Sequence, residues 1–215
     1  MSPKEYSALL KAVNRFVKAA DGELTERLEN EGYIDPEETV EEINRLQDQV
    51  AEHLEAQRVH ITAGLLNGDI LPMIQQEDAT AVHLQVTFQA ELESNVKSLG
   101  DSYIKAVASD MQLGTLSSRT RDWLHSWSKD LGEIMELGTY DDVERILGTA
   151  MEEGSSMVDV AEQLIDAYAF SPTRARATSI TELLTAHSYA AKEAMMQNPV
   201  VDRKMWRHTG AQKND

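Results

Sequence analysis

The segment VHLQVTFQAELESNVKSLGDSYIKAV, residues 82–107, decides between an all-helical fold and a mixed one. Apolar and polar residues alternate from Val82 to Gln89, which is typical of a half-buried strand. A second pattern covers the whole segment, because apolar residues also recur every three or four positions, as on one face of a helix. A strand here needs a partner, and no second clear strand pattern lies nearby. We therefore predict one long helix from about residue 78 to residue 111.

Helix start signals recur on both sides of this segment. Ser2-Pro3-Lys4-Glu5 is a capping box with proline at the first helical position, and Asp35-Pro36-Glu37-Glu38 repeats the pattern. Start signals and apolar spacing together predict seven further helices. These run over residues 3–20, 21–31 and 35–67, from Ser118 through Ile134, from Thr139 through Ala150, from Ser156 through Tyr168, and over 171–197. Residues 200–208 are expected to be extended, and 209–215 to form a polar turn.

The composition fits a globular helical chain. Of its 215 residues 41% are hydrophobic and 27% charged, and with 11 Gly and 5 Pro the collagen-like and Pro-rich classes are excluded. The absence of cysteine excludes a disulfide scaffold, thiolate metal sites and cysteine catalysis. No apolar run approaches the ~20 residues of a membrane span, and the start MSPKEY lacks the pattern of a signal peptide. We expect a soluble, non-secreted, mainly α protein: an elongated helical bundle with long helices and a short extended segment at the C-terminus.

The charge is strongly negative and unevenly distributed. The net charge of -17 argues against general binding to nucleic acids or anionic membranes, because both are polyanions. Residues 171–215 nevertheless carry +3, which leaves -20 on the preceding 170 residues. An acidic body with a mildly basic end could contact two different partners. A solvated surface with a random charge gradient explains the same numbers.

One basic cluster near the C-terminus suggests contact with nucleic acid. An extended run of cations with an aromatic side chain can follow a phosphate backbone and stack on a base. An edge strand protected by charge is the alternative interpretation. The residues predicted to bind nucleic acid are Arg203, Lys204, Trp206, Arg207 and Lys213.

Catalytic and metal-binding motifs are missing from the sequence. It contains no glycine-rich phosphate loop, no Gly-x-Ser-x-Gly elbow and no His-Glu-x-x-His helix. His187 lies on an apolar stripe and is interpreted as a satisfied core or interface histidine. Glu182, on the last long helix, is the one acid considered for a buried catalytic role, but no second residue converges on it by spacing. We expect no enzyme activity, no cofactor and no metal. Leu54 and Ile61, on a long apolar stripe, are predicted to contact a protein partner.

Four motifs in the second half occur in the order found in a known family. They are Arg119-Thr120-Arg121-Asp122-Trp123-Leu124, followed by Leu131-Gly132; Met151-Glu152-Glu153-Gly154-Ser155-Ser156; Arg174 to Glu182, continued by Tyr189 and Lys192; and Lys204 to Gly210. Residues 115–215 thereby resemble the phage Mu F-like minor head proteins, also called phage head morphogenesis proteins. Two departures are evident. Ile180 stands where the family usually has Arg, and the chain stops at Asn214-Asp215, before the family's His-containing loop.

The resemblance implies a structural role in a viral head. It suggests two domains: residues 1–114, acidic and helical, and residues 115–215, a head morphogenesis domain truncated at its C-terminus. The implied protein is a low-copy component of the procapsid interior, present in the virion and, during assembly, in the host cytoplasm. Its implied partners are the portal protein, the major capsid or scaffolding protein, and double-stranded DNA at the basic end, with homo-oligomerisation left open. A helical adaptor unrelated to capsids is the alternative function.

Overall fold

The protein's structure, a computed structural model, describes residues 20–68, 77–199 and 201, and these residues are almost entirely helical. The described residues contain no strand, which confirms the prediction of a mainly α bundle with long helices. Apart from Ala20, which precedes α2, the predicted helix at 3–20 lies outside the described residues, as does the predicted extended segment apart from Val201. The helices are α2 (Asp21–Glu31), α3 (Pro36–Leu66), α5 (Glu77–Val107), α6 (Ser118–Glu153), α7 (Met157–Ile165) and α8 (Pro172–Gln197), with a 3-10 turn η1 (Tyr168–Phe170) before α8.

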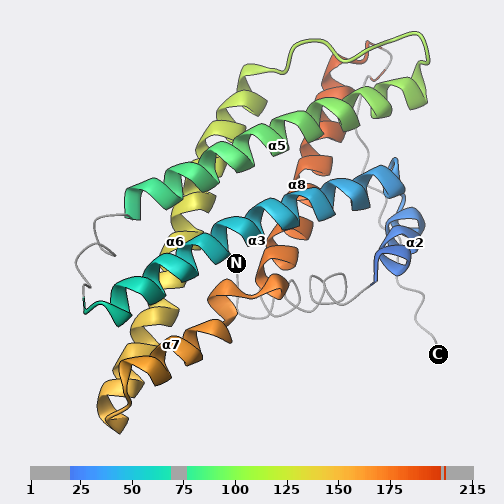
Figure 1. Cartoon of the computed structure of the whole chain (residues 1–215). Helices are drawn as coiled ribbons and strands as arrows, with labels where there is room; N and C mark the ends of the chain where they lie inside the picture. Colours follow the sequence, from blue (N-terminus) through green and yellow to red (C-terminus); the bar gives the residue numbers. More distant parts are fainter. Residues whose placement is uncertain (1–19, 69–76, 200, 202–215) are drawn as a thin grey trace, which may run out of the picture.

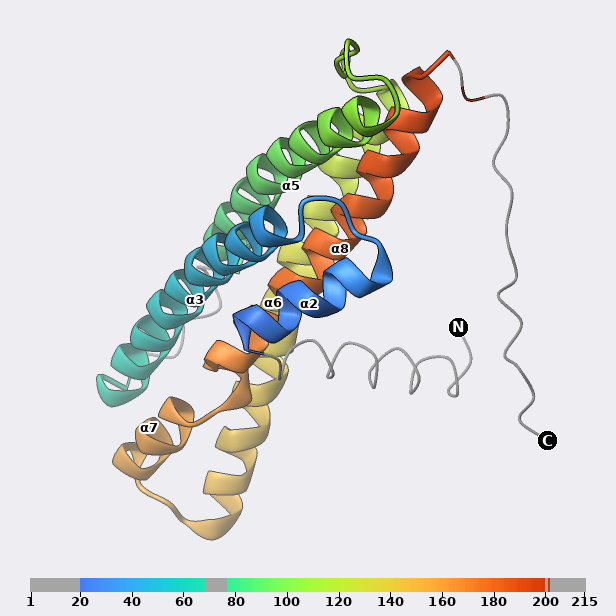
Figure 2. The same cartoon turned by 90° about the vertical axis from the view of Figure 1, so that its right-hand side faces the viewer.

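Four long helices make up the elongated body of the molecule. Figures 1 and 2 show α3 and α5 side by side, with α6 and α8 packed against them and α7 folded back along the far end of α6. Helices α3 and α5 are antiparallel, since His53 contacts Thr87 near one end and Glu38 contacts Ser98 near the other. Helix α8 packs on α3, α5 and η1, and its side chains bond to α6. Within the described residues, none of the helices is both long enough and apolar enough to cross a bilayer.

Residues 82–107, whose sequence fits both a strand and a helix, are helical and belong to α5. Leu84 and Phe88 are buried, whereas Val82 and Val86 are 54% and 62% exposed. The apolar residues that fit only the strand pattern therefore face solvent, and those that continue the helical stripe face the core. The prediction of one long helix is confirmed, although α5 ends at Val107, four residues before the expected end.

Helix α6 corrects the predicted break at Thr139. The chain remains helical from Ser118 to Glu153, so the expected second helix start is wrong. The hydroxyl of Thr139 donates to the carbonyl of Met135 one turn earlier, at 2.9 Å, instead of capping a new helix. It also accepts a hydrogen bond from Arg174 of α8 at 2.8 Å. A tertiary contact thus satisfies the residue whose type suggested a helix cap.

The other predicted starts in the second half hold. Ser156 and Asp159 form a complete capping box at α7, and Ser171 accepts from the backbone N–H of Arg174 at the start of α8. Gly154 ends α6 in the left-handed conformation, with a φ of 71°. This sharp corner turns the chain back so that α7 packs on α6.

Helices from both sides of residue 114 contribute to a single hydrophobic cluster. Leu92 and Leu99 of α5, Leu124 of α6, and Leu183 and Ala190 of α8 all belong to it. Helix α5 packs on both α6 and α8. The division into domains 1–114 and 115–215 stays a prediction, and the described helices on either side of it share one core.

Gly132 of α6 allows the backbones of α5 and α6 to approach closely. A Cβ at this position would lie 2.7 Å from the carbonyl oxygen of Ala81, closer than side-chain carbons come to backbone atoms. Gly148, further along the same helix, has no atom within 4 Å of the equivalent position. Substitutions at these two glycines therefore distinguish the energetic effect of the close helix contact from the intrinsic effect of glycine on helix stability.

We expect Gly132→Ala to destabilise the fold by about 1–3 kcal/mol, because the added methyl forces α5 and α6 apart. Gly148→Ala should stabilise it by about 0.5–1 kcal/mol through helix propensity alone. Urea unfolding followed by circular dichroism measures both free energies of unfolding. Equal effects of the same sign would contradict the close contact between α5 and α6.

Candidate functional site

The residues predicted to bind partners are not assembled into one described site. Arg203, Lys204, Trp206, Arg207 and Lys213 lie outside the described residues. Leu54 and Ile61 lie within the core, each 1% exposed. Their apolar stripe packs inside the chain, so the described packing gives no support to the prediction that they contact a partner.

Arg174 connects α6, η1 and α8 through hydrogen bonds to neutral acceptors. Its guanidinium donates to the Thr139 hydroxyl at 2.8 Å and to the carbonyls of Ala169 and Met135, each at 2.7 Å. Burial lowers the pKa of Arg174 from its usual value, because desolvation penalises the cation. Two backbone carbonyls and a hydroxyl replace part of its lost hydration, so this cation serves to anchor the start of α8.

Glu182 is buried between α8 and α6, as its selection from the sequence suggested. The side chain is 4% exposed, and Oε2 accepts from the indole Nε1 of Trp127 at 2.6 Å. Burial raises its pKa to about 7, and the hydrogen bond from Trp127 opposes that rise. An indole N–H only donates, so Trp127 cannot exchange a proton with this carboxyl. One turn earlier on α6, Trp123 stacks on Tyr189 of α8 with ring centroids 3.6 Å apart.

Glu193 secures the N-terminus of α6. Its carboxylate accepts from the backbone N–H of Ser117 at 2.7 Å and from the hydroxyls of Ser117 and Thr120 at 2.9 and 2.6 Å. Burial alone would raise its pKa, but hydrogen bonds from Thr120, Gln197 and Ser117 outweigh burial and lower it. An ionised carboxylate at a helix N-terminus also interacts favourably with the helix dipole. This site therefore serves to position α6 against the end of α8.

His187 is a buried histidine on the opposite face of α8, in agreement with the interpretation from sequence. Its Nε2 lies 2.8 Å from the hydroxyl of Thr39 in α3. The Thr39 hydroxyl donates to the carbonyl of Asp35, so it accepts from His187, which places the imidazole proton on Nε2. Burial lowers the pKa of His187 to about 4, and the ring is neutral at neutral pH.

A cavity of about 370 Å³ opens beside this histidine. Tyr33 and Tyr103 pack against the imidazole in edge-to-face geometry, with ring centroids 5.0 and 6.3 Å away. Lys192 and Met195 of α8 complete much of the wall. Its volume is within the range of small-ligand pockets, and its lining mixes aromatic with charged and polar side chains.

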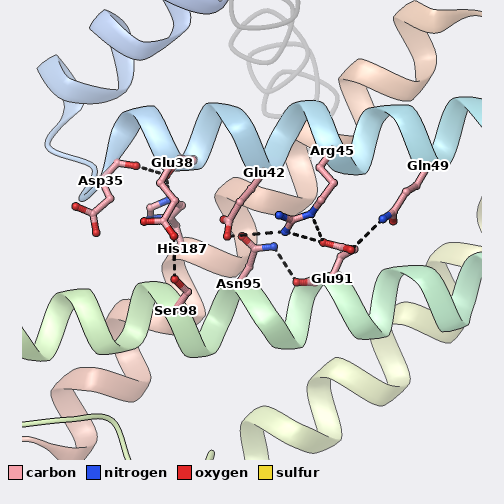
Figure 3. Close-up of polar contacts among 10 residues, drawn as sticks. Asp35, Glu38, Glu42, Arg45, Gln49, Glu91, Asn95, Ser98 and His187 are labelled. Atoms are coloured by element: carbon pink, nitrogen blue, oxygen red, sulfur yellow. Dashed lines mark hydrogen bonds and ion pairs between the residues drawn. The ribbon is translucent and has the colours of Figure 1, made fainter.

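The seam between α3 and α5 is lined with polar side chains, and the sequence pattern did not predict these contacts. Figure 3 shows side chains of both helices pointing into the seam. Arg45 donates from Nε and Nη2 to Oε2 of Glu91, at 3.0 and 2.9 Å, and Gln49 donates to the other oxygen of Glu91 at 3.0 Å. Glu42 is buried in the same seam. The signal was present, because Glu42 falls on the buried stripe of α3 beside Ile43, but pairing across helices cannot be inferred from spacing.

The buried sites described above can bind and release protons. Glu42, Glu182 and His187 have shifted pKa values, and each lies in a different helix interface. Among the described residues, no group of three His, Cys, Asp or Glu side chains could hold a metal ion. The described geometry thus identifies a helical bundle whose interfaces contain isolated titratable groups.

Comparisons with known proteins reveal one informative similarity. The chain is 37% identical over 139 residues to "Uncharacterized protein YqbB" of Bacillus subtilis (strain 168). This region makes up 65% of the present chain and 46% of the relative, so the chain spans about half of the relative's length. No protein-family model matches the chain, and no solved structure matches it.

We expect the stability of the protein to depend on the protonation of Glu182. Its pKa is about 7 in the folded state and 4.5 for the unperturbed group, so between these values the folded state binds more protons. The stability that protonated Glu182 contributes to the folded state is fully present below pH 4.5 and is lost as the pH rises through 7. Glu182→Gln keeps an acceptor for Trp127 without titrating. The variant should therefore gain stability relative to wild type, on the order of 2 kcal/mol, between pH 5 and pH 8.

Urea unfolding at each pH measures this difference. The comparison with wild type is essential, because His187, with a lowered pKa, contributes stability that changes with pH in the opposite direction. Glu162→Gln removes an exposed carboxylate from α7 and is the matched control. A constant difference between Glu182→Gln and wild type across this pH range would disprove the role of Glu182.

Proposed function

We propose that the chain is a non-enzymatic, low-copy component of a bacteriophage head that acts in head assembly and contacts the portal vertex. The proposal rests on the four motifs that resemble the phage Mu F-like minor head proteins. The supporting observation is the way in which three of these motifs meet in space. Under this proposal the protein needs no cofactor and resides in the capsid interior, and in the host cytoplasm during assembly.

Residues of the family-like motifs form one connected unit of α6, α7 and α8. Trp123 of the first motif stacks on Tyr189, which continues the third. Arg174, which begins the third motif, bonds to Thr139 and to the carbonyl of Met135 in α6. The second motif supplies the corner at Gly154 between α6 and α7. Motifs that each match weakly thus occupy structurally coupled positions, which supports a common origin rather than chance matches.

The acidic body suits contact with proteins rather than with DNA. The chain up to residue 170 carries -20, and phosphate backbones repel such a surface. Long helices present extended faces along which a capsid, scaffolding or portal subunit can pack. These partners are assigned to the helical body, and DNA is assigned to the basic end.

Quantitative mass spectrometry of procapsids and mature particles tests the proposal. Particles are purified from cells that carry the genome encoding this chain, and the chain is counted against the portal subunit and the major capsid protein. We expect a low copy number that scales with the portal subunit in procapsids. Loss on maturation would indicate an assembly or ejected role within the same proposal. Absence from both particles would contradict the proposal and favour a helical adaptor unrelated to capsids.

Contact with DNA through the C-terminal cluster is tested separately. We expect the full chain to retard linear double-stranded DNA at low salt, and a variant with Arg203, Lys204 and Arg207 changed to Gln to lose this shift. Neutralising three cations should reduce the slope of log affinity against log salt by about 3. A variant with the exposed residues Arg119, Arg121 and Lys129 changed to Gln removes the same charge from α6. No shift at low salt, or equal loss in both variants, would remove DNA from the proposed partners.

A further inference from the structure

Several buried polar atoms in the seam between α3 and α5 lack a hydrogen-bond partner among the described residues. Three buried side-chain oxygens have no donor among the residues that the structure describes: Oε2 of Glu42, Oδ1 of Asn95 and Oε1 of Gln49. A buried acceptor without a donor costs about 1–3 kcal/mol. Such groups are rare in native proteins, so a cluster of them calls for a missing donor.

Two of these acceptors face one another across the seam. Figure 3 shows the carboxyl group of Glu42, on α3, and the side chain of Asn95, on α5, pointing toward each other. Asn95 donates from Nδ2 to the backbone carbonyl of Glu91 at 2.8 Å, which identifies Oδ1 as the remaining atom and fixes the orientation of the amide. Glu42 is 6% exposed and Asn95 is fully buried. A carboxylate and an amide oxygen placed in this way repel each other, whereas one proton between them satisfies both.

The charges that reach Glu42 come from α3 and α5, and they do not neutralise it. On α3, Glu38 is one turn before it, and Nη2 of Arg45 lies 4.0 Å from Oε1 of Glu42. On α5, Glu91 faces the same space and holds Arg45 by two hydrogen bonds. Two carboxylates therefore surround Glu42, and the nearest cation is already paired.

The charged and titratable groups of the other neighbouring helices are engaged elsewhere on α3. From α8, Arg176 bonds to Asn44 and Gln47 of α3 and to Asp21 of α2. His187 of α8 is neutral and bonds to Thr39. Among the described residues, Arg45 is the one cation whose charge acts on Glu42.

We propose that Glu42 binds a proton in the folded protein and donates it to Oδ1 of Asn95, so that this proton holds α3 against α5. Loss of the proton places a carboxylate against the amide oxygen and against Glu91, and weakens the contact between the two helices. The seam is thus a proton-operated latch. In support, burial raises the pKa of Glu42 to about 7; Arg45 opposes the rise, and Glu38 and Glu91 add to it.

The titration of the carboxyl group tests the first half of the proposal directly. The full chain, labelled with 13C at the glutamate side-chain carboxyls, is titrated by NMR in wild type and in Glu42→Gln. We expect two carboxyl signals with titration midpoints near pH 7, one lost in Glu42→Gln and the other in Glu182→Gln. A Glu42 signal that titrates in the ordinary range for glutamate would overturn the proposal.

Amide hydrogen exchange tests whether the proton holds the two helices together. After correction for intrinsic rates, protection of α3 and α5 amides in wild type should fall by up to about tenfold for each pH unit between 4.5 and 7 and level off above 7, because over this range opening is coupled to the loss of one proton. Glu42→Gln places an amide donor opposite Asn95 and should show a smaller fall in protection than wild type over the same pH range. Glu182→Gln is the control and should retain the pH-dependent loss in α3 and α5. Equal loss in wild type and Glu42→Gln would overturn the latch.

A second variant keeps the test valid if Glu42→Gln does not fold. Asn95→Asp places another carboxyl group opposite Glu42, and the pair then shares a proton, as neighbouring carboxyls do. We expect the Glu42 titration to move to higher pH in this variant. An unchanged titration would show that Glu42 and Asn95 are not in contact and would overturn the proposal.

Discussion

The fold depends on the burial of α8 among the other long helices. This helix packs on α3 and α5 and bonds to α6 through side chains, so its polar side chains need partners on several sides. Small side chains at 175, 179, 186, 190 and 194 allow its neighbours to approach closely. Between them, Glu182 and Glu193 bond to α6, and His187 bonds to α3. Each polar contact is made at one register only, so together they fix the position of α8 along both neighbours.

Buried titratable groups connect this packing to pH. An acid with a raised pKa stabilises the fold at low pH, and a histidine with a lowered pKa stabilises it at high pH. Glu42 and Glu182 belong to the first kind and His187 to the second. Between pH 4.5 and 6.5, two groups of the first kind oppose one of the second. The net effect is that alkaline rather than acidic conditions loosen the interfaces near neutral pH.

The sequence predicted features that depend on local periodicity and missed those that depend on distant partners. The apolar stripe from Leu84 onward correctly identified α5, because only a helix places these residues on one face. The predicted break at Thr139 was wrong because Arg174, 35 residues away, bonds to its hydroxyl. His187 was interpreted as a buried histidine because it lies on an apolar stripe, and Glu182 was the one acid considered for a buried role. Their partners Trp127 and Thr39 could not be recognised, since helix spacing contains no information about which helices meet.

The similarity to YqbB bears on how the two halves of the chain relate. The resemblance to head proteins covers only residues 115–215, and the preceding segment has 114 residues. A similarity over 139 residues is longer than either part, so it crosses residue 114 and includes helices from both sides. The structure gives a physical reason for keeping these helices together. Gly132 of α6 admits the backbone of α5, and α8 buries side chains of α3 and α5. Removing either part would expose the apolar face of the other, so the acidic helices are integral to the core rather than an appendage.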